Sequence, residues 1–169
     1  SDAFPLSYTD WDEALSVTVV SLASDGHCDQ GYLLYGNFCY HFEIEDVKNW
    51  RDAEARCVSE QGHLVSFQRQ EELSFLTGEV KISHLPGEAW VGLNDIDNEN
   101  HFVFTDGTTP GILPWGPNQP DNWQDNEDCV QIRGMNHHEA GLLNDDFCTS
   151  TKEYICKNGN ARASPAPRR

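Results

Sequence analysis

The stretch that most constrains the fold is Gln119–Cys129, with the sequence QPDNWQDNEDC. Acidic and amide side chains occupy most of its positions, so it forms neither a buried strand nor a regular amphipathic helix. Carboxylates this close together repel one another unless a cation or water compensates them. The ligand atoms are oxygens, which suit calcium, and no His/Cys cluster has the spacing of a zinc site. A solvated acidic loop is the alternative.

A second acidic segment lies further along the chain. It is Asn144-Asp145-Asp146, shortly before Cys148. If Cys129 and Cys148 are bonded, the disulfide brings this segment beside the first one. The two segments together would then offer enough oxygen atoms for one calcium ion, which takes about six to eight.

Charge and length exclude some functions and favour others. The chain has 169 residues, with 11 Lys and Arg against 28 Asp and Glu, and a formal net charge of -17. One domain with a tail is expected from this length. A nucleic-acid partner is excluded because a phosphate backbone needs a basic surface. The acidic surplus fits a protein that holds cations.

Six cysteines in a polar chain indicate an oxidising compartment, so we expect a secreted protein or an extracellular domain. Reduced structural thiols in the cytosol are the disfavoured alternative. Six cysteines allow fifteen pairings, and spacing alone does not choose among them. No apolar run of about 18 residues is present, so no membrane insertion is expected. No signal peptide is seen, which suggests a mature form or an excised domain.

The N-terminal part is predicted to hold an extension and a hairpin. Residues 1–27 are an N-terminal extension or linker, with one predicted strand at Leu15–Leu22 whose pairing partner the sequence does not identify. Residues Gly31–Phe42 form two short strands around the turn at Gly36-Asn37. A disulfide from Cys28 to Cys39 would hold this hairpin together.

Two helices are predicted next. The first is capped by Asp46 or Asn49 and runs to about Gln61, where Gly62 ends it. Its apolar face consists of Trp50, Ala53, Cys57 and Val58. The second runs from Arg69 to Thr77, buries Leu73 and Leu76, and is ended by Gly78.

Short strands and long loops fill the rest. The predicted strands are His63–Phe67, Trp90–Leu93, Phe102–Gly107, Val130–Arg133 and Glu153–Cys156. Residues 108–126 and 134–142 form loops, and loops of this length are usually functional or disordered. Because the first of these loops carries the acidic stretch, we favour function. Residues 157–169 are expected to form a disordered C-terminal tail.

Taken together, these motifs resemble the C-type lectin-like domain over residues 28–156. They occur in the order seen in that family: a helix bearing Cys57, a second helix, Trp90-Val91-Gly92-Leu93, the Gln-Pro-Asp loop, Glu127-Asp128-Cys129-Val130, Asn144-Asp145, Cys148 and Tyr154-Ile155-Cys156. The resemblance implies an α+β fold with two helices packed on small antiparallel sheets and a long calcium-binding loop region. It also implies three disulfides, Cys28–Cys39, Cys57–Cys156 and Cys129–Cys148.

The resemblance implies a main calcium site formed by Gln119, Asp121, Glu127, Asn144 and Asp145. Two neighbouring sugar hydroxyls would complete the coordination of Ca²⁺, donating protons to carboxylates and accepting protons from amides. The peptide bond before Pro120 is expected to be cis. An auxiliary calcium site would consist of Asp95, Glu99, Asn122 and Asp128, with Glu127 shared; solvated side chains at Asp95 and Glu99 are the alternative.

The order Gln-Pro-Asp goes with galactose-type sugars in this family, whereas Glu-Pro-Asn goes with mannose-type sugars. Trp123 stands where galactose-binding members place an aromatic ring under the apolar face of the sugar. The sugar site is thus predicted at Gln119, Asp121, Trp123, Glu127 and Asn144, with loop packing as the alternative role of Trp123.

Two departures from the family pattern bear on specificity. The strongest galactose binders carry a glycine-rich insertion after the tryptophan that fixes its ring, and only three residues separate Trp123 from Glu127 here. Weaker discrimination between sugars is therefore expected. The loop before Asn144 is longer than usual, borders the sugar site, and could select an extended glycan.

The sequence therefore predicts a calcium-dependent lectin for terminal galactose or N-acetylgalactosamine on glycoproteins or glycolipids. The alternative is a module of the same fold that binds a protein or a surface without binding sugar. An enzyme is not expected, because no carboxylic acid in an apolar pocket faces a second carboxylate. The sequence is compatible with an oligomer.

Overall fold

The computed structural model describes residues 28–80 and 85–159, so the predicted strand Leu15–Leu22 lies outside the described residues. The elements along the chain are β1 (Leu33–Tyr35), β2 (Phe38–Lys48), α2 (Trp50–Ser59), β3 (His63–Leu64), α3 (Gln70–Glu79), β4 (Glu88–Asn94), β5 (Val103–Phe104), the 3-10 turn η2 (Trp123–Asp125), β6 (Cys129–Arg133), β7 (Leu143–Asp146) and β8 (Lys152–Gly159). The α+β class is confirmed.

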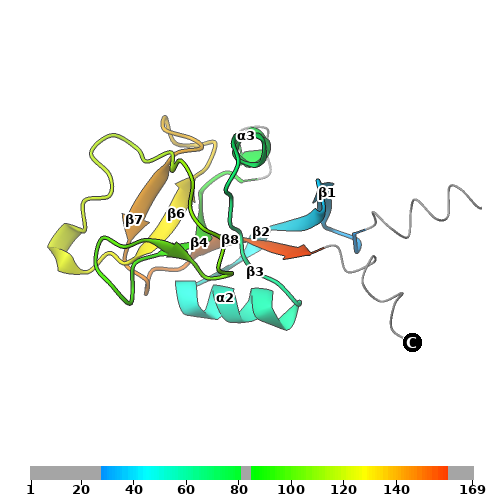
Figure 1. The fold of residues 1–169 in the computed structure, drawn as a ribbon, viewed down its shortest axis with the longest axis horizontal. Coiled ribbons are helices and arrows are strands. Elements are labelled where there is room, and N and C mark those ends of the chain that lie inside the picture. The colour runs from blue at the N-terminus through cyan, green and yellow to red at the C-terminus, as the bar shows by residue number, and fades with distance from the viewer. Residues whose placement is uncertain (1–27, 81–84, 160–169) are drawn as a thin grey trace, which may run out of the picture.

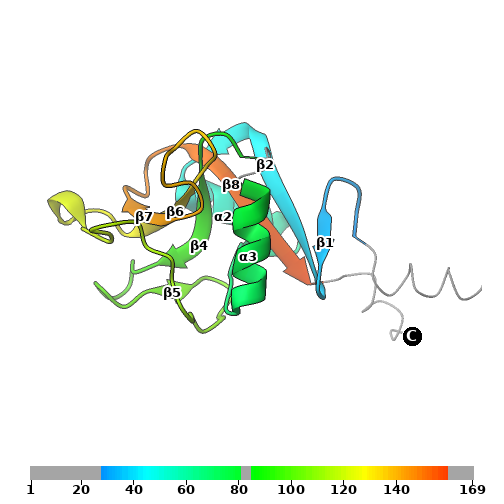
Figure 2. The same ribbon diagram turned by 90° about the horizontal axis from the view of Figure 1, so that it is seen from above.

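The strands join into one path in the order β1-β2-β8-β4-β6-β7, with β3 on β8 and β5 on β4. All pairings are antiparallel except that of β4 with β8, which links the two antiparallel groups. Helices α2 and α3 lie on opposite sides of these strands (Figure 1). Seen from above, the β1–β2 hairpin lies at one end of the molecule and the turn η2 at the other (Figure 2).

Helix α2 follows the prediction closely at its start and less closely at its end. Asn49 is the N-cap, and its side chain accepts a hydrogen bond from the backbone N–H of Asp52 at 2.9 Å. Val58, predicted to be on the apolar face, is instead half exposed. Gln61, rather than Gly62, adopts the left-handed conformation after the helix. Gly62 has a different role, since a Cβ there would lie 2.4 Å from the carbonyl oxygen of Lys157.

Helix α3 does not end at Gly78 as predicted. It buries Leu73 and Leu76 as expected but continues to Glu79, and Val80 after it is fully buried. A single glycine costs a helix only about 1 kcal/mol, so burial of Val80 outweighs it. The predicted strand His63–Phe67 is also shorter, because only His63 and Leu64 pair with β8.

The three expected disulfides are all present: Cys28–Cys39, Cys57–Cys156 and Cys129–Cys148. The second joins α2 to β8 inside a buried cluster that also contains Trp50 and Trp90. The indole N–H of Trp50 donates to the carbonyl oxygen of Val91 at 2.9 Å, which ties α2 to β4. The Cys129–Cys148 disulfide holds the start of β6 beside the segment after β7. It thereby brings the two acidic segments together, as expected.

Strand β8 extends three residues beyond Cys156. Residues 157–159 were expected to belong to a disordered tail, yet they pair with residues 38–40 of β2. Lys157 is buried, and its ammonium group contacts the carboxylate of Glu72 at 2.5 Å. Neither helix within residues 28–80 and 85–159 has the length and apolarity that a membrane crossing requires.

Candidate functional site

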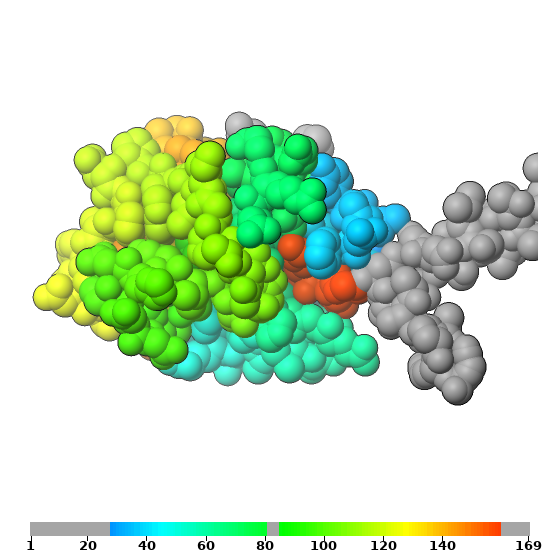
Figure 3. Space-filling view, in the orientation of Figure 1, coloured from blue at the N-terminus to red at the C-terminus, as the bar shows by residue number. Residues whose placement is uncertain are grey.

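The acidic segments meet in the loops at the end of the molecule away from the β1–β2 hairpin. The surface there is formed by the green-to-yellow part of the chain (Figure 3). Gln119 precedes a cis peptide bond to Pro120, as expected. Its backbone N–H donates to the carbonyl oxygen of Gly116 at 3.0 Å. Its side-chain oxygen Oε1 is buried and has no hydrogen-bond partner within the described chain. Such an atom is costly unless a ligand satisfies it.

A first acidic cluster is formed by Asp121, Glu127 and Asp145, each of which places one carboxylate oxygen within 4.8 Å of the others. Asp145 is almost fully buried, and its two oxygens accept hydrogen bonds from the backbone N–H groups of Asp121 at 3.1 Å and Asn122 at 2.8 Å. Glu127 accepts one from the backbone N–H of Trp123 at 3.1 Å. The loop is thus folded around the carboxylates that it carries.

The pKa values of two carboxyl groups in this cluster are raised, which means that their charged forms are destabilised. Burial, together with the nearby carboxylates of Asp121 and Asp145, raises the pKa of Glu127 to about 7, although the hydrogen bond from the Trp123 N–H opposes the shift. Burial also raises the pKa of Asp145, although the N–H groups of Asn122 and Asp121 oppose the shift. A cation among these oxygens would relieve the repulsion, which fits the chemistry of a hard metal ion.

Asn144 lies beside this cluster in the chain. It is a half-buried residue of β7 directly before Asp145, and it pairs with Gln131 of β6. Both predicted ligands of this segment are therefore carried by one strand, which the Cys129–Cys148 disulfide fixes to β6.

A second acidic cluster is formed by Asp95, Glu99 and Asp128. One oxygen of Asp95 accepts from the backbone N–H of Asn100 at 2.8 Å, while Oδ1 is buried and has no partner among the described residues. Burial, followed by the proximity of Asp95, raises the pKa of Asp128. The fourth predicted member, Asn122, makes its hydrogen bonds elsewhere, because its Oδ1 accepts from the N–H of Glu127 at 3.1 Å. Asn122 therefore contacts residues of the first acidic cluster, Glu127 and Asp145, and not those of the second.

Trp123 is 55% exposed and lies in η2 next to the first cluster. Its indole contacts the ring of Phe147, with 5.9 Å between ring centroids and an angle of 59° between the planes. Phe147 is placed by its neighbour Cys148 and by a hydrogen bond from the N–H of Ser150 to its carbonyl oxygen at 3.0 Å. Sequence reasoning missed Phe147, although an aromatic residue between the acidic segment and Cys148 was a usable signal.

The long loop at residues 134–142 borders Gln119. A Cβ added to Gly116 would lie 3.0 Å from Oε1 of Glu139 and 3.8 Å from Cγ of Gln119, so Glu139 and Gln119 lie on the same side of this glycine's backbone. Glu139 faces Arg133 at 3.8 Å. The loop at residues 134–142 therefore lies near Gln119, whereas its place at a sugar site and its role in selecting glycans stay predictions.

Comparison with known proteins identifies the family. The family model described as the lectin C-type domain matches residues 46–158. The low affinity immunoglobulin epsilon Fc receptor of Mus musculus is 34% identical over 131 residues. Among solved structures, the C-type lectin CEL-I from Cucumaria echinata is 32% identical with a TM-score of 0.69, and the match covers 78% of this chain and 96% of CEL-I.

The cow CD23 C-type carbohydrate-recognition domain, solved in the presence of a GlcNAc2Man3 oligosaccharide, is 30% identical with a TM-score of 0.69, and the match covers 79% of this chain and 97% of that one. The match to the mouse receptor covers 77% of this chain but only 37% of the receptor, so the chain spans little more than a third of that protein's length. With most of the described residues matched by sequence and by structure, the chain belongs to the C-type lectin domain family.

Proposed function

We propose that this protein is a calcium-dependent lectin, and that it recognises terminal galactose or N-acetylgalactosamine on extracellular glycans. The observation that carries the proposal is the meeting of three carboxylates, Asp121, Glu127 and Asp145; in the same loop an amide oxygen of Gln119 is buried without a partner among the described residues. The oligosaccharide present with the related cow domain supports a carbohydrate ligand. Three disulfides support an oxidising, extracellular location.

The main site would hold Ca²⁺ through side-chain oxygens of Gln119, Asp121, Glu127, Asn144 and Asp145. The ion would supply open coordination positions that two neighbouring sugar hydroxyls fill. The side chains would then form hydrogen bonds with the two sugar hydroxyls. The carboxylates of Asp121 and Glu127 would accept the hydroxyl protons, and the amides of Gln119 and Asn144 would donate to the hydroxyl oxygens. Asp145 also holds the loop, since its carboxylate accepts the N–H groups of Asp121 and Asn122.

The second cluster supports an auxiliary calcium site at Asp95, Glu99 and Asp128. Its buried Oδ1 on Asp95 has the same unsatisfied character as the Gln119 oxygen. Asn122 would contribute by joining the two loops rather than through a contact within this cluster. We assign this site a stabilising role, because it lies between the segment after β4 and the segment before β6.

Galactose preference would come from two features. Gln119 precedes the proline and Asp121 follows it, which is the order that the family resemblance associates with galactose-type sugars. Trp123 presents an exposed indole beside the same cluster. Galactose has an axial O4, which leaves a continuous C–H patch that an aromatic ring covers.

Retention on a galactose resin tests this function. The protein should be retained in millimolar calcium and released by excess chelator or by free galactose, because the ligand carboxylates and the sugar share the ion. A glycan array in calcium and in chelator would then identify the terminal sugar. Equal retention in chelator and in calcium would contradict the proposal, as would specific binding to a protein surface without any sugar signal.

Substitutions of Trp123 and of its neighbour Phe147 test whether the indole stacks on the sugar. Trp123→Ala should weaken galactose binding about tenfold, since a stacked ring contributes about 1 kcal/mol or more. Phe147→Ala should weaken it less, because the indole stays but loses one neighbour. Calcium affinity, followed by titration calorimetry without sugar, should be nearly unchanged in both variants. Galactose binding equal to that of the parent in Trp123→Ala would leave Trp123 as a packing residue.

A further inference from the structure

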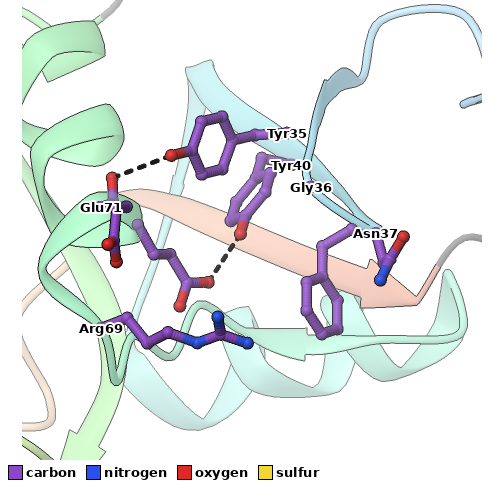
Figure 4. Close-up of a pocket in the computed structure, with 8 residues that line it drawn as sticks. Tyr35, Gly36, Asn37, Tyr40, Arg69 and Glu71 are labelled. Carbon is purple, nitrogen blue, oxygen red and sulfur yellow. Dashed lines mark hydrogen bonds between the residues drawn. The ribbon is translucent and has the colours of Figure 1, made fainter.

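A cavity lies between the β1–β2 hairpin and the start of α3, at the end of the molecule away from the acidic loops (Figure 4). Its volume is about 310 Å³, at the lower end of the range for small-molecule sites. Aromatic residues form much of its wall, and charged and amide groups lie among them. Its main lining residues are Tyr35, Asn37, Phe38, Tyr40, Arg69 and Glu72.

The carboxylate of Glu72, which lines this cavity, is held by two hydrogen bonds. The hydroxyl of Tyr40 donates to Oε2 of Glu72 at 2.6 Å, and the ammonium group of Lys157 donates to the same oxygen at 2.5 Å. Oε1 of Glu72 accepts only a long bond, 3.4 Å, from the backbone N–H of Gln68. The carboxylate is therefore fixed and neutralised by Lys157, yet it keeps one oxygen with capacity to accept a ligand hydroxyl.

Arg69 supplies a cation at this cavity. It is exposed, and its guanidinium makes no hydrogen bond or ion pair with another residue of the described chain, although its backbone carbonyl accepts from the N–H of Leu73 at 3.1 Å. In Figure 4 its guanidinium extends away from α3 toward the hairpin, below the hydroxyl of Tyr40. A guanidinium presents two parallel N–H groups that match the two oxygens of a carboxylate.

Phe38 supplies an apolar surface. Phe38 is 40% exposed as a residue, and the ammonium group of Lys157 lies 4.1 Å from its ring centroid. Next to it, the ring of Tyr35 is stacked on Phe75 at 4.5 Å and its hydroxyl donates to the carbonyl oxygen of Glu71 at 3.3 Å. The aromatic wall is thus held in place from behind.

We propose that this cavity binds a hexuronic acid unit of an acidic glycan, and that it does so without calcium. Arg69 pairs with the sugar carboxylate, the ring of Phe38 covers a C–H face of the sugar, and Oε1 of Glu72 accepts a hydroxyl proton. A neutral sugar would leave Arg69 unpaired, and an aromatic acid would leave Oε1 of Glu72 without a donor. The ligand that satisfies all three groups is a hydroxylated ring that carries a carboxylate.

The net charge of -17 does not oppose this assignment strongly. Both clusters of clashing carboxylates lie in the loops at the other end of the molecule (Figures 1 and 3), and charges beyond the Debye length of about 8 Å are largely screened at physiological salt. Near the cavity, Lys157 neutralises Glu72. Arg69 balances the charge of Glu71, the other carboxylate that lines the cavity, so the lining carries no net negative charge.

An NMR titration of the full ¹⁵N-labelled chain in chelator tests the proposal independently of the calcium site. Methyl β-glucuronide should shift the backbone signals of Gly36, Asn37, Phe38 and Arg69, with a dissociation constant of the order of 1 mM. Methyl β-glucoside, which lacks only the carboxylate, should bind at least about tenfold more weakly, because a charge-assisted pair is lost. An unchanged hairpin spectrum on adding chelator is the control for folding.

Variants define the contacts. Arg69→Ala should weaken glucuronide binding about tenfold or more, and Arg69→Lys should weaken it less, because it keeps the charge and loses the paired N–H geometry. Arg51→Ala, which removes an exposed arginine of α2, should leave binding unchanged. Equal binding of glucoside and glucuronide, or full binding by Arg69→Ala, would overturn the proposal. Tighter binding of benzoate than of glucuronide would overturn the assignment of a sugar.

Discussion

Calcium is expected to raise the melting temperature of this protein by about 10 °C at pH 8 and by little at pH 5. A ligand present at about a hundred times its dissociation constant stabilises the folded state by about 2.7 kcal/mol, which corresponds to a shift of about this size in a domain of this length. Protons compete for the same carboxylates, because Asp121, Glu127 and Asp145 must be deprotonated to hold the ion. The calcium effect should therefore grow as the pH rises.

Without calcium the trend should be the opposite. The folded-state pKa of Glu127 is raised from 4.5 to about 7, so the folded protein binds a proton more tightly than the unfolded chain does. The resulting stabilisation is fully present below about pH 4.5 and is lost as the pH rises through 7. The raised pKa values of Asp145, Asp95 and Asp128 act in the same direction. The melting temperature in chelator should fall between pH 5 and pH 8.

Thermal unfolding at both pH values, each in calcium and in chelator, measures these trends. Glu127→Gln should flatten the pH dependence in chelator and remove most of the calcium effect, because it removes the main titrating group and a ligand oxyanion. Glu45→Gln is the matched control, since Glu45 is exposed on β2 and outside both clusters. A calcium shift of the same size at pH 5 and pH 8 would show that these carboxylates do not hold the ion.

The local signals in the sequence were strong enough to place much of the fold. Asn49 caps α2, and the spacing of Trp50, Ala53 and Cys57 oriented its buried face. The cis bond before Pro120 was expected from the family resemblance. The disulfides followed only from the family resemblance, because spacing leaves every pairing open. The clustering of Asp121, Glu127 and Asp145 likewise depends on a disulfide that joins distant segments.

The misses have a common cause, which is tertiary packing that no local pattern reveals. Gly78 failed to end α3 because Val80 gains a buried position beyond it. The strand β8 continues past Cys156 because β2 offers it a hydrogen-bonding edge. The contact of Phe147 with Trp123 joins two residues that are far apart along the chain. The cavity at Arg69 joins a hairpin and a helix that the sequence predicts separately.

Exchanging the amide and the acid around Pro120 is expected to reverse the sugar preference. The double variant Gln119→Glu with Asp121→Asn keeps the net charge and the number of side-chain oxygens. It places a carboxylate where Gln119 now has a buried oxygen without a described partner, and an amide donor where Asp121 now contacts Glu127. A galactose hydroxyl then meets a donor where it needs an acceptor, and such a mismatch costs about 1–3 kcal/mol, which is a loss of about 5-fold to 150-fold in affinity.

Mannose-type sugars, whose hydroxyl pair suits the exchanged order, should gain affinity, although Trp123 would obstruct some of them and limit the gain. Competition by free galactose and free mannose against an immobilised glycan measures the change directly. The matched control is Gln124→Glu with Asp125→Asn, which makes the same exchange in the exposed turn outside both acidic clusters, and it should leave the preference as it is. If galactose remains the better competitor by the parent's margin, donor and acceptor order does not set specificity here. Selectivity would then have to come from the shape of the site around Trp123 and the loop at residues 134–142.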